Sequence, residues 1–142
     1  MKIYARGRTG WVKKEIIKVH PEWIDKYKVI SSMAYGAGSE FPHQITGKPI
    51  CITPNSCCTE TYLVVDTFDN QQESLNLATY LRTRLVRFLI SLKKNSQHLT
   101  KDRFAFVPDL DMNIEWTDEM LYAKYKLTSQ EIDFIASIVK EM

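Results

Sequence analysis

The sequence predicts a mixed α+β domain with a small mixed sheet, one long amphipathic helix and a C-terminal pair of helices. Short β-prone runs lie early in the chain, a helical apolar periodicity follows them, and strands and helices do not alternate regularly. The 142 residues, 44% of them hydrophobic, suffice for one core, so we expect a single domain over residues 1–142. Within it we expect residues 27–108 to form an α/β core and residues 109–142 a helical tail, with residues 1–26 preceding both.

Short runs rich in β-branched and aromatic residues predict the strands. These runs are Tyr27–Ile30, Pro49–Thr53, Thr61–Val65 and Phe104–Val107. The residues Pro54, Asn55 and Ser56 end the second run, and Pro108 ends the last. A glycine-containing loop at residues 34–39 separates the first two runs.

The clearest predicted element is a single helix that begins at Asp69 or Asn70 and runs to about Lys94. Its apolar residues recur with helical spacing at Ala78, Leu81, Leu85, Phe88, Leu89 and Leu92. At about 100° per residue, the opposite face collects Tyr80, Arg84, Arg87, Ser91 and Lys94. We therefore expect that face to be basic and exposed to solvent.

Two further helices are predicted from their N-terminal capping signals. Thr117 can cap a short helix that continues through Tyr125. Thr128 and Glu131 form a capping box that opens a last helix, with Ile132, Ile135 and Val139 as its buried stripe.

The net charge of +2 hides a segmented distribution of charge along the chain. Residues 1–49 carry nine Lys/Arg against four Asp/Glu, and residues 82–103 carry seven against one. Residues 50–81 carry none against four, and residues 104–142 carry three against eight. Alternating blocks of this kind suit a domain with one electropositive face for a polyanion.

Several classes of protein are excluded or disfavoured by the sequence. No apolar stretch approaches the roughly 20 residues that a bilayer span needs, so we expect no membrane association. The N-terminus lacks the apolar segment of a secretory signal, and the three cysteines fit a reducing cytoplasm. We therefore expect a cytoplasmic protein.

Catalytic and metal sites find little support in the spacing of reactive residues. Cys51, Cys57 and Cys58 are not spaced as zinc ligands, and the sequence favours buried small hydrophobes; a Cys nucleophile paired with His43 or His98 stays an alternative. The glycine loops that bind nucleotide phosphates are absent. Asp109 and Asp111 are candidate ligands of a nuclease metal, although a turn is the simpler interpretation.

Residues suited to binding nucleic acid concentrate in the second basic block. Lys and Arg neutralise phosphates, whereas Asn, Gln and His match the donors and acceptors on base edges. As phosphate contacts we expect Arg84, Arg87, Lys93, Lys94, Lys101 and Arg103. As base contacts we expect Asn95, Gln97 and His98, with Asn55, Thr59 and the Tyr35–Gly38 loop as further contacts.

One further pattern is the order of five segments and a short ending: Pro49–Val65, Leu77–Leu89, Lys94–Thr100, Phe104–Pro108 and Trp116–Thr128, followed by Glu131 and Ile132. This order resembles the C-terminal target-recognition region of bacterial restriction-modification enzymes with an N6-adenine DNA methyltransferase, related to TaqI-like specificity domains. The resemblance covers about residues 27–142, with residues 27–108 as the recognition core.

The resemblance implies a domain that grips duplex DNA and reads its bases for a catalytic methyltransferase or endonuclease domain of the same polypeptide or complex. The Asn-Pro-Pro-Tyr motif of the methylase is missing, so S-adenosylmethionine and magnesium are expected only in the full enzyme and no cofactor in this chain. Two alternatives remain: a docking module between restriction-modification subunits, and a small metal-dependent nuclease that uses Asp109 and Asp111.

Overall fold

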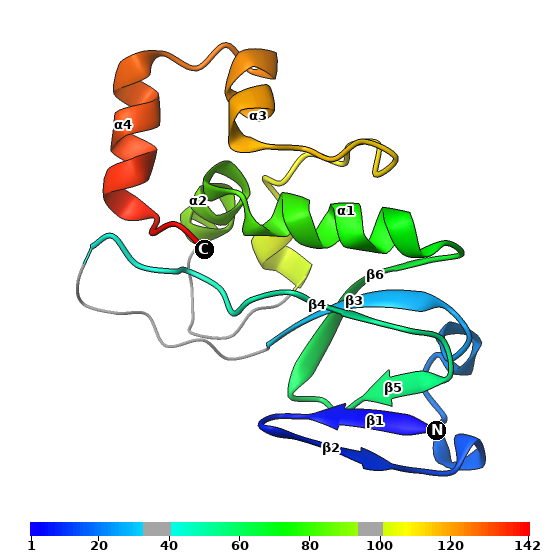
Figure 1. Ribbon diagram of the computed structural model, residues 1–142. Helices are drawn as coiled ribbons and strands as arrows, with labels where there is room; N and C mark the ends of the chain where they lie inside the picture. Colours follow the sequence, from blue (N-terminus) through cyan, green and yellow to red (C-terminus); the bar gives the residue numbers. More distant parts are fainter. Residues whose placement is uncertain (33–40, 94–100) are drawn as a thin grey trace.

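The predicted α+β class is confirmed by the computed structural model, which describes residues 1–32, 41–93 and 101–142 (Figure 1). In place of one small mixed sheet, these residues form two sheets of three strands each. The sheet strands are β1 (Lys2–Ala5), β2 (Arg8–Trp11), β3 (Tyr27–Ser32), β4 (Ile50–Ile52), β5 (Ser56–Cys58) and β6 (Tyr62–Phe68). The sheets lie toward one end of the molecule and the last two helices toward the other.

The first sheet, which we call sheet A, has the strand order β2-β1-β5. Strands β1 and β2 form an antiparallel hairpin, in which Gly7 takes a positive φ of 74° that a residue without Cβ adopts at little cost. Strand β5 pairs with β1 in parallel. Sheet A is therefore mixed, but the sequence predicted none of its strands: β1 and β2 lie in residues 1–11, and Ser56 was expected to end a strand.

The second sheet, sheet B, is antiparallel with the order β4-β3-β6. The pairing of β3 with β6 shifts register between Val29 and Ile30, which marks a bulge. The predicted run Pro49–Thr53 forms β4, and the chain then turns at Asn55 to begin β5 in the other sheet. Residues 53–55 thus link the two sheets.

The predicted long helix is wrong, because the structure divides it into α1 (Gln71–Arg82) and α2 (Arg84–Leu92). Asn70 caps α1 by accepting a hydrogen bond from the Glu73 amide, as expected. Thr83 has extended dihedral angles, φ −63° and ψ 151°, and caps α2 through the Val86 amide. Helix α1 lies on sheet B, and its apolar side packs into the main core.

The C-terminal helices follow the sequence prediction closely. They are α3 (Asp118–Lys124), capped by Thr117, and α4 (Ser129–Ile138), which begins with the full capping box of Thr128 and Glu131. Ile135 and Val139 are buried and Ile132 is half-buried. Both helices pack against α2.

The predicted strand at residues 104–107 is wrong. The segment instead contains the 3₁₀ helix η3 (Lys101–Phe104), followed by a turn in which the Val107 amide bonds the Phe104 carbonyl at 2.9 Å. Two further 3₁₀ turns, η1 (Lys14–Ile16) and η2 (Pro21–Trp23), connect β2 to β3. Apolar side chains around η3 pack against the main core without joining a sheet.

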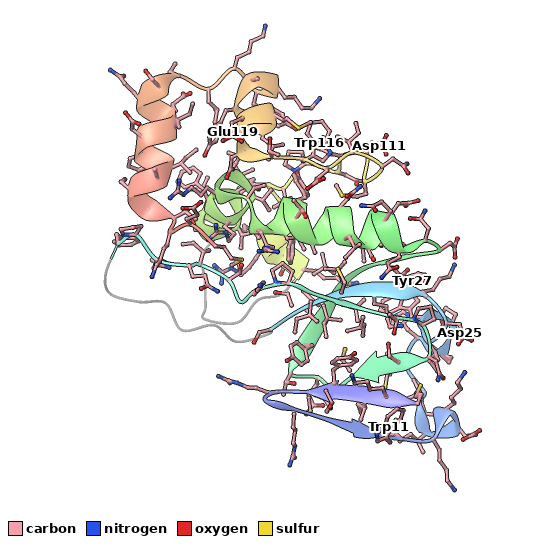
Figure 2. The ribbon with its side chains drawn as sticks, in the orientation of Figure 1. Trp11, Asp25, Tyr27, Asp111, Trp116 and Glu119 are labelled. Atoms are coloured by element: carbon pink, nitrogen blue, oxygen red, sulfur yellow. The ribbon has the colours of Figure 1, made fainter. Side chains whose placement is uncertain are left out.

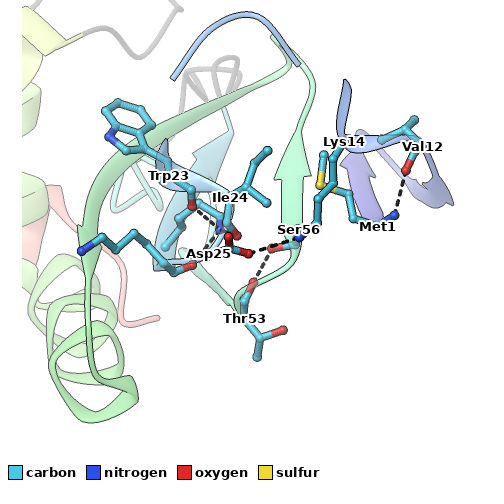
Figure 3. Close-up of polar contacts among 10 residues, drawn as sticks. Met1, Val12, Lys14, Trp23, Ile24, Asp25, Thr53 and Ser56 are labelled. Carbon is cyan, nitrogen blue, oxygen red and sulfur yellow. Dashed lines mark hydrogen bonds and ion pairs between the residues drawn. The ribbon is translucent and has the colours of Figure 1, made fainter. Parts of the chain in front are cut away.

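Polar contacts hold the connection between β2 and β3 against the sheets (Figure 3). The Met1 ammonium donates to the Val12 carbonyl at 2.7 Å, and Lys14 pairs with Asp25 at 3.4 Å. The buried Lys28 ammonium donates to the carbonyls of Trp23, Ile24 and Lys26. All three donors of that ammonium are thus satisfied by the η2 turn and the residues after it.

Candidate nucleic-acid interface

Arg87 is not on the exposed basic face that the sequence predicts. Its side chain is only 1% exposed, and its guanidinium donates to four backbone carbonyls. Nε reaches Arg82 at 3.0 Å and Thr83 at 3.3 Å, whereas one terminal nitrogen reaches Gln44 at 3.1 Å and Lys140 at 2.6 Å. Burial lowers the pKa of this guanidinium, and nearby Asp118 opposes the lowering. Arg87 is a structural residue, and its assignment to a DNA contact is corrected.

Tyr80 also departs from the predicted exposed face. Its ring is buried, and its hydroxyl donates to the Pro108 carbonyl at 2.7 Å. Burial raises the pKa of this phenol. The break at Thr83 changes the angular relation between residues before and after it, so a periodicity drawn through both helices no longer describes one face.

Arg84 lies at the start of α2 in an environment shared with acidic groups. Its side chain is half-buried and donates through Nε to the Val139 carbonyl at 3.2 Å. Arg82, Arg84 and Arg87 line a cavity of about 570 Å³ together with Asp118, Glu119 and Glu141. This part of the basic block therefore meets the acidic C-terminal block within the molecule, which weakens its field toward an external polyanion.

The other predicted phosphate contacts lie around the end of α2 and in η3. Lys93 is half-buried, with its ammonium 5.9 Å from the Phe106 ring centroid, and Lys101 is exposed. Arg103 is half-buried, and burial lowers the pKa of its guanidinium. The predicted contacts Lys94, Asn95, Gln97 and His98 and the Tyr35–Gly38 loop lie outside the described residues.

Asn55 and Thr59 lie immediately before and after β5 of sheet A and not on α2. Asn55 is exposed at a positive φ of 62°, and its amide donates to the Ile24 carbonyl at 2.8 Å. Thr59 is half-buried, and its amide donates to the Tyr4 carbonyl at 2.9 Å. The two residues flank β5, so the structure associates them with the N-terminal hairpin.

One group of exposed cations among the described residues was not assigned from the sequence. We call it the N-terminal basic surface: it consists of Lys2, Arg6, Arg8, Lys13, Lys14 and Lys18 on sheet A and the η1 segment. Glu15 is the single carboxylate in residues 1–18. Five of the six cations are exposed, and within the described residues Arg6, Arg8 and Lys13 form no ion pair. The excess positive charge of residues 1–49 was the signal for this surface.

The cysteines are poorly placed for nucleophilic catalysis. Burial raises the pKa of all three thiols, and that of Cys58 reaches about 11. The Cys51 thiol donates to the Ser74 carbonyl at 3.3 Å, and the His43 ring accepts from the Ile45 amide at 3.1 Å. A nucleophilic cysteine requires a lowered pKa, which none of these thiols has. The three cysteines are half-buried and not fully buried as the sequence suggested.

Asp111 has a turn-forming role. One of its carboxylate oxygens accepts from the backbone and side-chain amides of Asn113 at 2.9 and 3.0 Å. In the ranges that the structure describes, no three His, Cys, Asp or Glu side chains gather as metal ligands. In the same ranges, no helix has the length and apolar character to cross a membrane.

The fold and its charged surfaces define an α+β domain with a cationic sheet at one end and acidic helices at the other. No family model, curated protein or solved structure matches the chain. The resemblance to restriction-modification specificity regions therefore stays a prediction.

Proposed function

We propose that this chain is a DNA-binding target-recognition domain of a restriction-modification protein, which positions duplex DNA for a catalytic domain outside the chain. The observation that carries the proposal is the N-terminal basic surface, where six cations accompany one carboxylate over residues 1–18. Exposed Lys and Arg side chains bind duplex phosphates and release condensed counterions. Asn55 and Thr59 lie beside this surface and offer polar groups that can contact DNA.

Lys93 and Lys101 supply a second set of phosphate contacts in this proposal. Together with the half-buried Arg103, they are what remains, among the described residues, of the basic block at residues 82–103 once the buried Arg87 and the acid-facing Arg82 and Arg84 are set aside. Their contribution is measured separately, because Lys93 follows the end of α2 and Lys101 begins η3, and neither lies on sheet A.

The test is the salt dependence of binding to a labelled duplex, measured by fluorescence anisotropy. The variant Arg6→Gln/Arg8→Gln/Lys13→Gln removes three exposed cations from the N-terminal basic surface. We expect weaker binding and a slope of log affinity against log salt that is shallower by about 3, since each lost phosphate contact removes about 0.9.

The matched control is Lys124→Gln/Lys126→Gln/Lys140→Gln, which removes three exposed cations from the C-terminal end. We expect this control to keep the wild-type slope. Equal slopes in both variants and the wild type would show that the N-terminal basic surface does not contact the duplex. The same measurement on Lys93→Gln/Lys101→Gln then gives the contribution of these two lysines to the salt slope.

An exposed apolar face on the helices favours the docking module as a second candidate. Phe134 of α4 is 58% exposed and its ring lies edge-on to Phe88 of α2, with 6.0 Å between the ring centroids. Leu92, one helical turn beyond Phe88, is 53% exposed. Apolar faces of this kind mark contacts with other proteins. A docking module would leave the duplex unbound at every salt concentration until its partner subunit is added.

A further inference from the structure

Trp11 differs in its surroundings from the other two tryptophans, Trp23 and Trp116. Figure 2 labels Trp11 on the hairpin and Trp116 before α3. Trp23 stacks on His20 with 3.8 Å between ring centroids, and Trp116 is buried and donates to the Asp111 carbonyl at 3.0 Å. Trp11 is 79% exposed, and its indole makes no ring or cation contact with any residue in the described part of the chain. The fold therefore does not use this indole for packing.

The position of Trp11 in sheet A leaves it accessible. It ends β2, which is the edge strand of sheet A, so no other strand among the described residues covers it. The preceding residues on the strand, Thr9 and Gly10, are small. The indole thus has room for a flat partner, with little other apolar surface from its own strand.

Three cations lie close to Trp11 along the hairpin: Lys2 on the same face of the sheet, Arg8 on the opposite face, and Lys13 beyond the end of β2. The hairpin register pairs Trp11 with Lys2, while Arg8 precedes it by three residues and Lys13 follows it by two. At about 3.3 Å per strand residue, these positions lie within roughly 10 Å of Trp11 along the chain. If these cations bind the charged groups of an anionic partner, the uncharged groups of that partner lie close to the indole.

The chemistry of the surface favours a nucleobase over a lipid surface. Insertion into a membrane interface uses an apolar face made of several residues. The neighbouring exposed aliphatic residues, Ile16 and Val19, instead line a cavity of about 510 Å³ with Trp23 and Val64. A single aromatic ring among cations is the arrangement on which unpaired bases stack while their phosphates are neutralised.

We propose that Trp11 stacks on a nucleobase exposed from the DNA stack, at an unpaired or single-stranded position of the DNA bound by the N-terminal basic surface. This inference rests on the proposed DNA-binding function and adds a base contact to its phosphate contacts. It gives the hairpin a preference for DNA that contains unstacked bases over a fully paired duplex.

The test compares an intact duplex, the same duplex with a short single-stranded gap, and a single strand, all by fluorescence anisotropy. We expect the wild type to bind the gapped duplex more tightly than the intact one. Trp11→Ala should weaken binding to the gapped duplex and single strand by about 5- to 150-fold, while affinity for the intact duplex stays within about twofold. Trp11→Tyr should keep most of the preference, because tyrosine retains a stacking ring.

Intrinsic fluorescence gives a second readout on the same complexes. Binding of the gapped duplex should quench the wild-type emission, and Trp11→Phe should remove this quenching while preserving affinity. Phe134→Ala, which removes an exposed aromatic ring from α4, is the matched control and should change neither readout.

The outcomes separate this inference from the proposed function. If the intact duplex binds and Trp11→Ala has the wild-type affinity for every probe, the base contact is rejected. The DNA-binding function would remain supported. Failure of every probe to bind would reject both. A blue shift of Trp11 emission on anionic phospholipid vesicles, with no change on gapped DNA, would assign the surface to membranes instead.

Discussion

Arg87 joins backbone segments that are far apart in the sequence. Its guanidinium donates to the carbonyls of Arg82 and Thr83 where α1 ends, to Gln44 before β4, and to Lys140 near the C-terminus. Carbonyl groups that are removed from water need such donors, because an unpaired polar group in the interior is unfavourable. The planar, forked guanidinium supplies several donors from one position, which a lysine does not.

Replacing Arg87 should therefore destabilise the fold. We expect Arg87→Met, which keeps much of the side-chain volume, to lower the free energy of unfolding by about 3 kcal/mol, because four carbonyl partners lose a charged donor. Urea unfolding followed by circular dichroism measures the change. Arg8→Met, at an exposed position of β2, is the control and should stay within about 0.5 kcal/mol of wild type. Equal stability of the two variants would contradict the structural role of Arg87.

At the scale of elements, the break between α1 and α2 is stabilised by side chains from both near and far. Thr83 accepts from the Val86 amide at 3.3 Å and donates to the Tyr80 carbonyl at 2.7 Å. The Asp118 carboxylate accepts from the amides of Arg84 and Leu85, both at 3.1 Å. These acceptors replace the carbonyls that a continuous helix would have offered, so α2 starts as a separate helix.

Removal of the Asp118 carboxylate tests this explanation of the break. We expect Asp118→Ala to lower the free energy of unfolding by about 1 to 2 kcal/mol, because the first turn of α2 loses its acceptor and a favourable charge near its N-terminus. Chemical denaturation measures this change in the free energy of unfolding. Glu119→Ala is the matched control, since Glu119 also lies in the first turn of α3 but accepts no α2 amide in the described structure. A loss of similar size in both variants would assign the effect to α3 alone.

Across the whole molecule, the elements with local signals are the ones that the sequence predicts well. Thr117 and Thr128 cap their helices through amides three residues further on, and such contacts depend on neighbouring residues alone. The break at Thr83 has a local cap in Thr83 itself but also depends on Asp118, a residue 35 positions away in the sequence. Periodicity within one segment contains no record of such a partner, so it predicted one continuous helix and a solvent position for Arg87.

In the candidate interface too, the sequence predicts what depends on neighbouring residues and misses what depends on residues far apart in the chain. Charge counts showed two basic blocks along the chain, and Arg6, Arg8 and Lys101 in these blocks are exposed in the structure. The counts did not show that Arg82 and Arg84 share a cavity with Asp118 and Glu119, because that arrangement arises when α2 packs on α3 and α4. The effect of a charge block on a partner therefore depends on which other block it meets in the fold.

The C-terminal segment connects α4 to α2 and to the segment before β4. Val139 is fully buried and forms an isolated parallel bridge with His43. The His43 amide donates to the Ile138 carbonyl at 3.1 Å, and the Lys140 amide donates to the His43 carbonyl at 2.8 Å. Because Arg87 also bonds the Lys140 carbonyl, residues 138–140 link α4, α2 and the segment before β4.

Truncation separates this linking segment from the residues after it. Removing residues 139–142 should lower the thermal midpoint by about 10 °C, because the core loses a buried valine worth about 1.5 kcal/mol or more and Arg87 loses a carbonyl partner. Removing only residues 141 and 142 keeps Val139 and Lys140 and should leave the midpoint within about 2 °C. Thermal unfolding followed by circular dichroism distinguishes the two. Equal midpoints would mean that the bridge to His43 does not stabilise the fold. The buried position of Arg87 would then depend on its contacts with α1 and residue 44 alone.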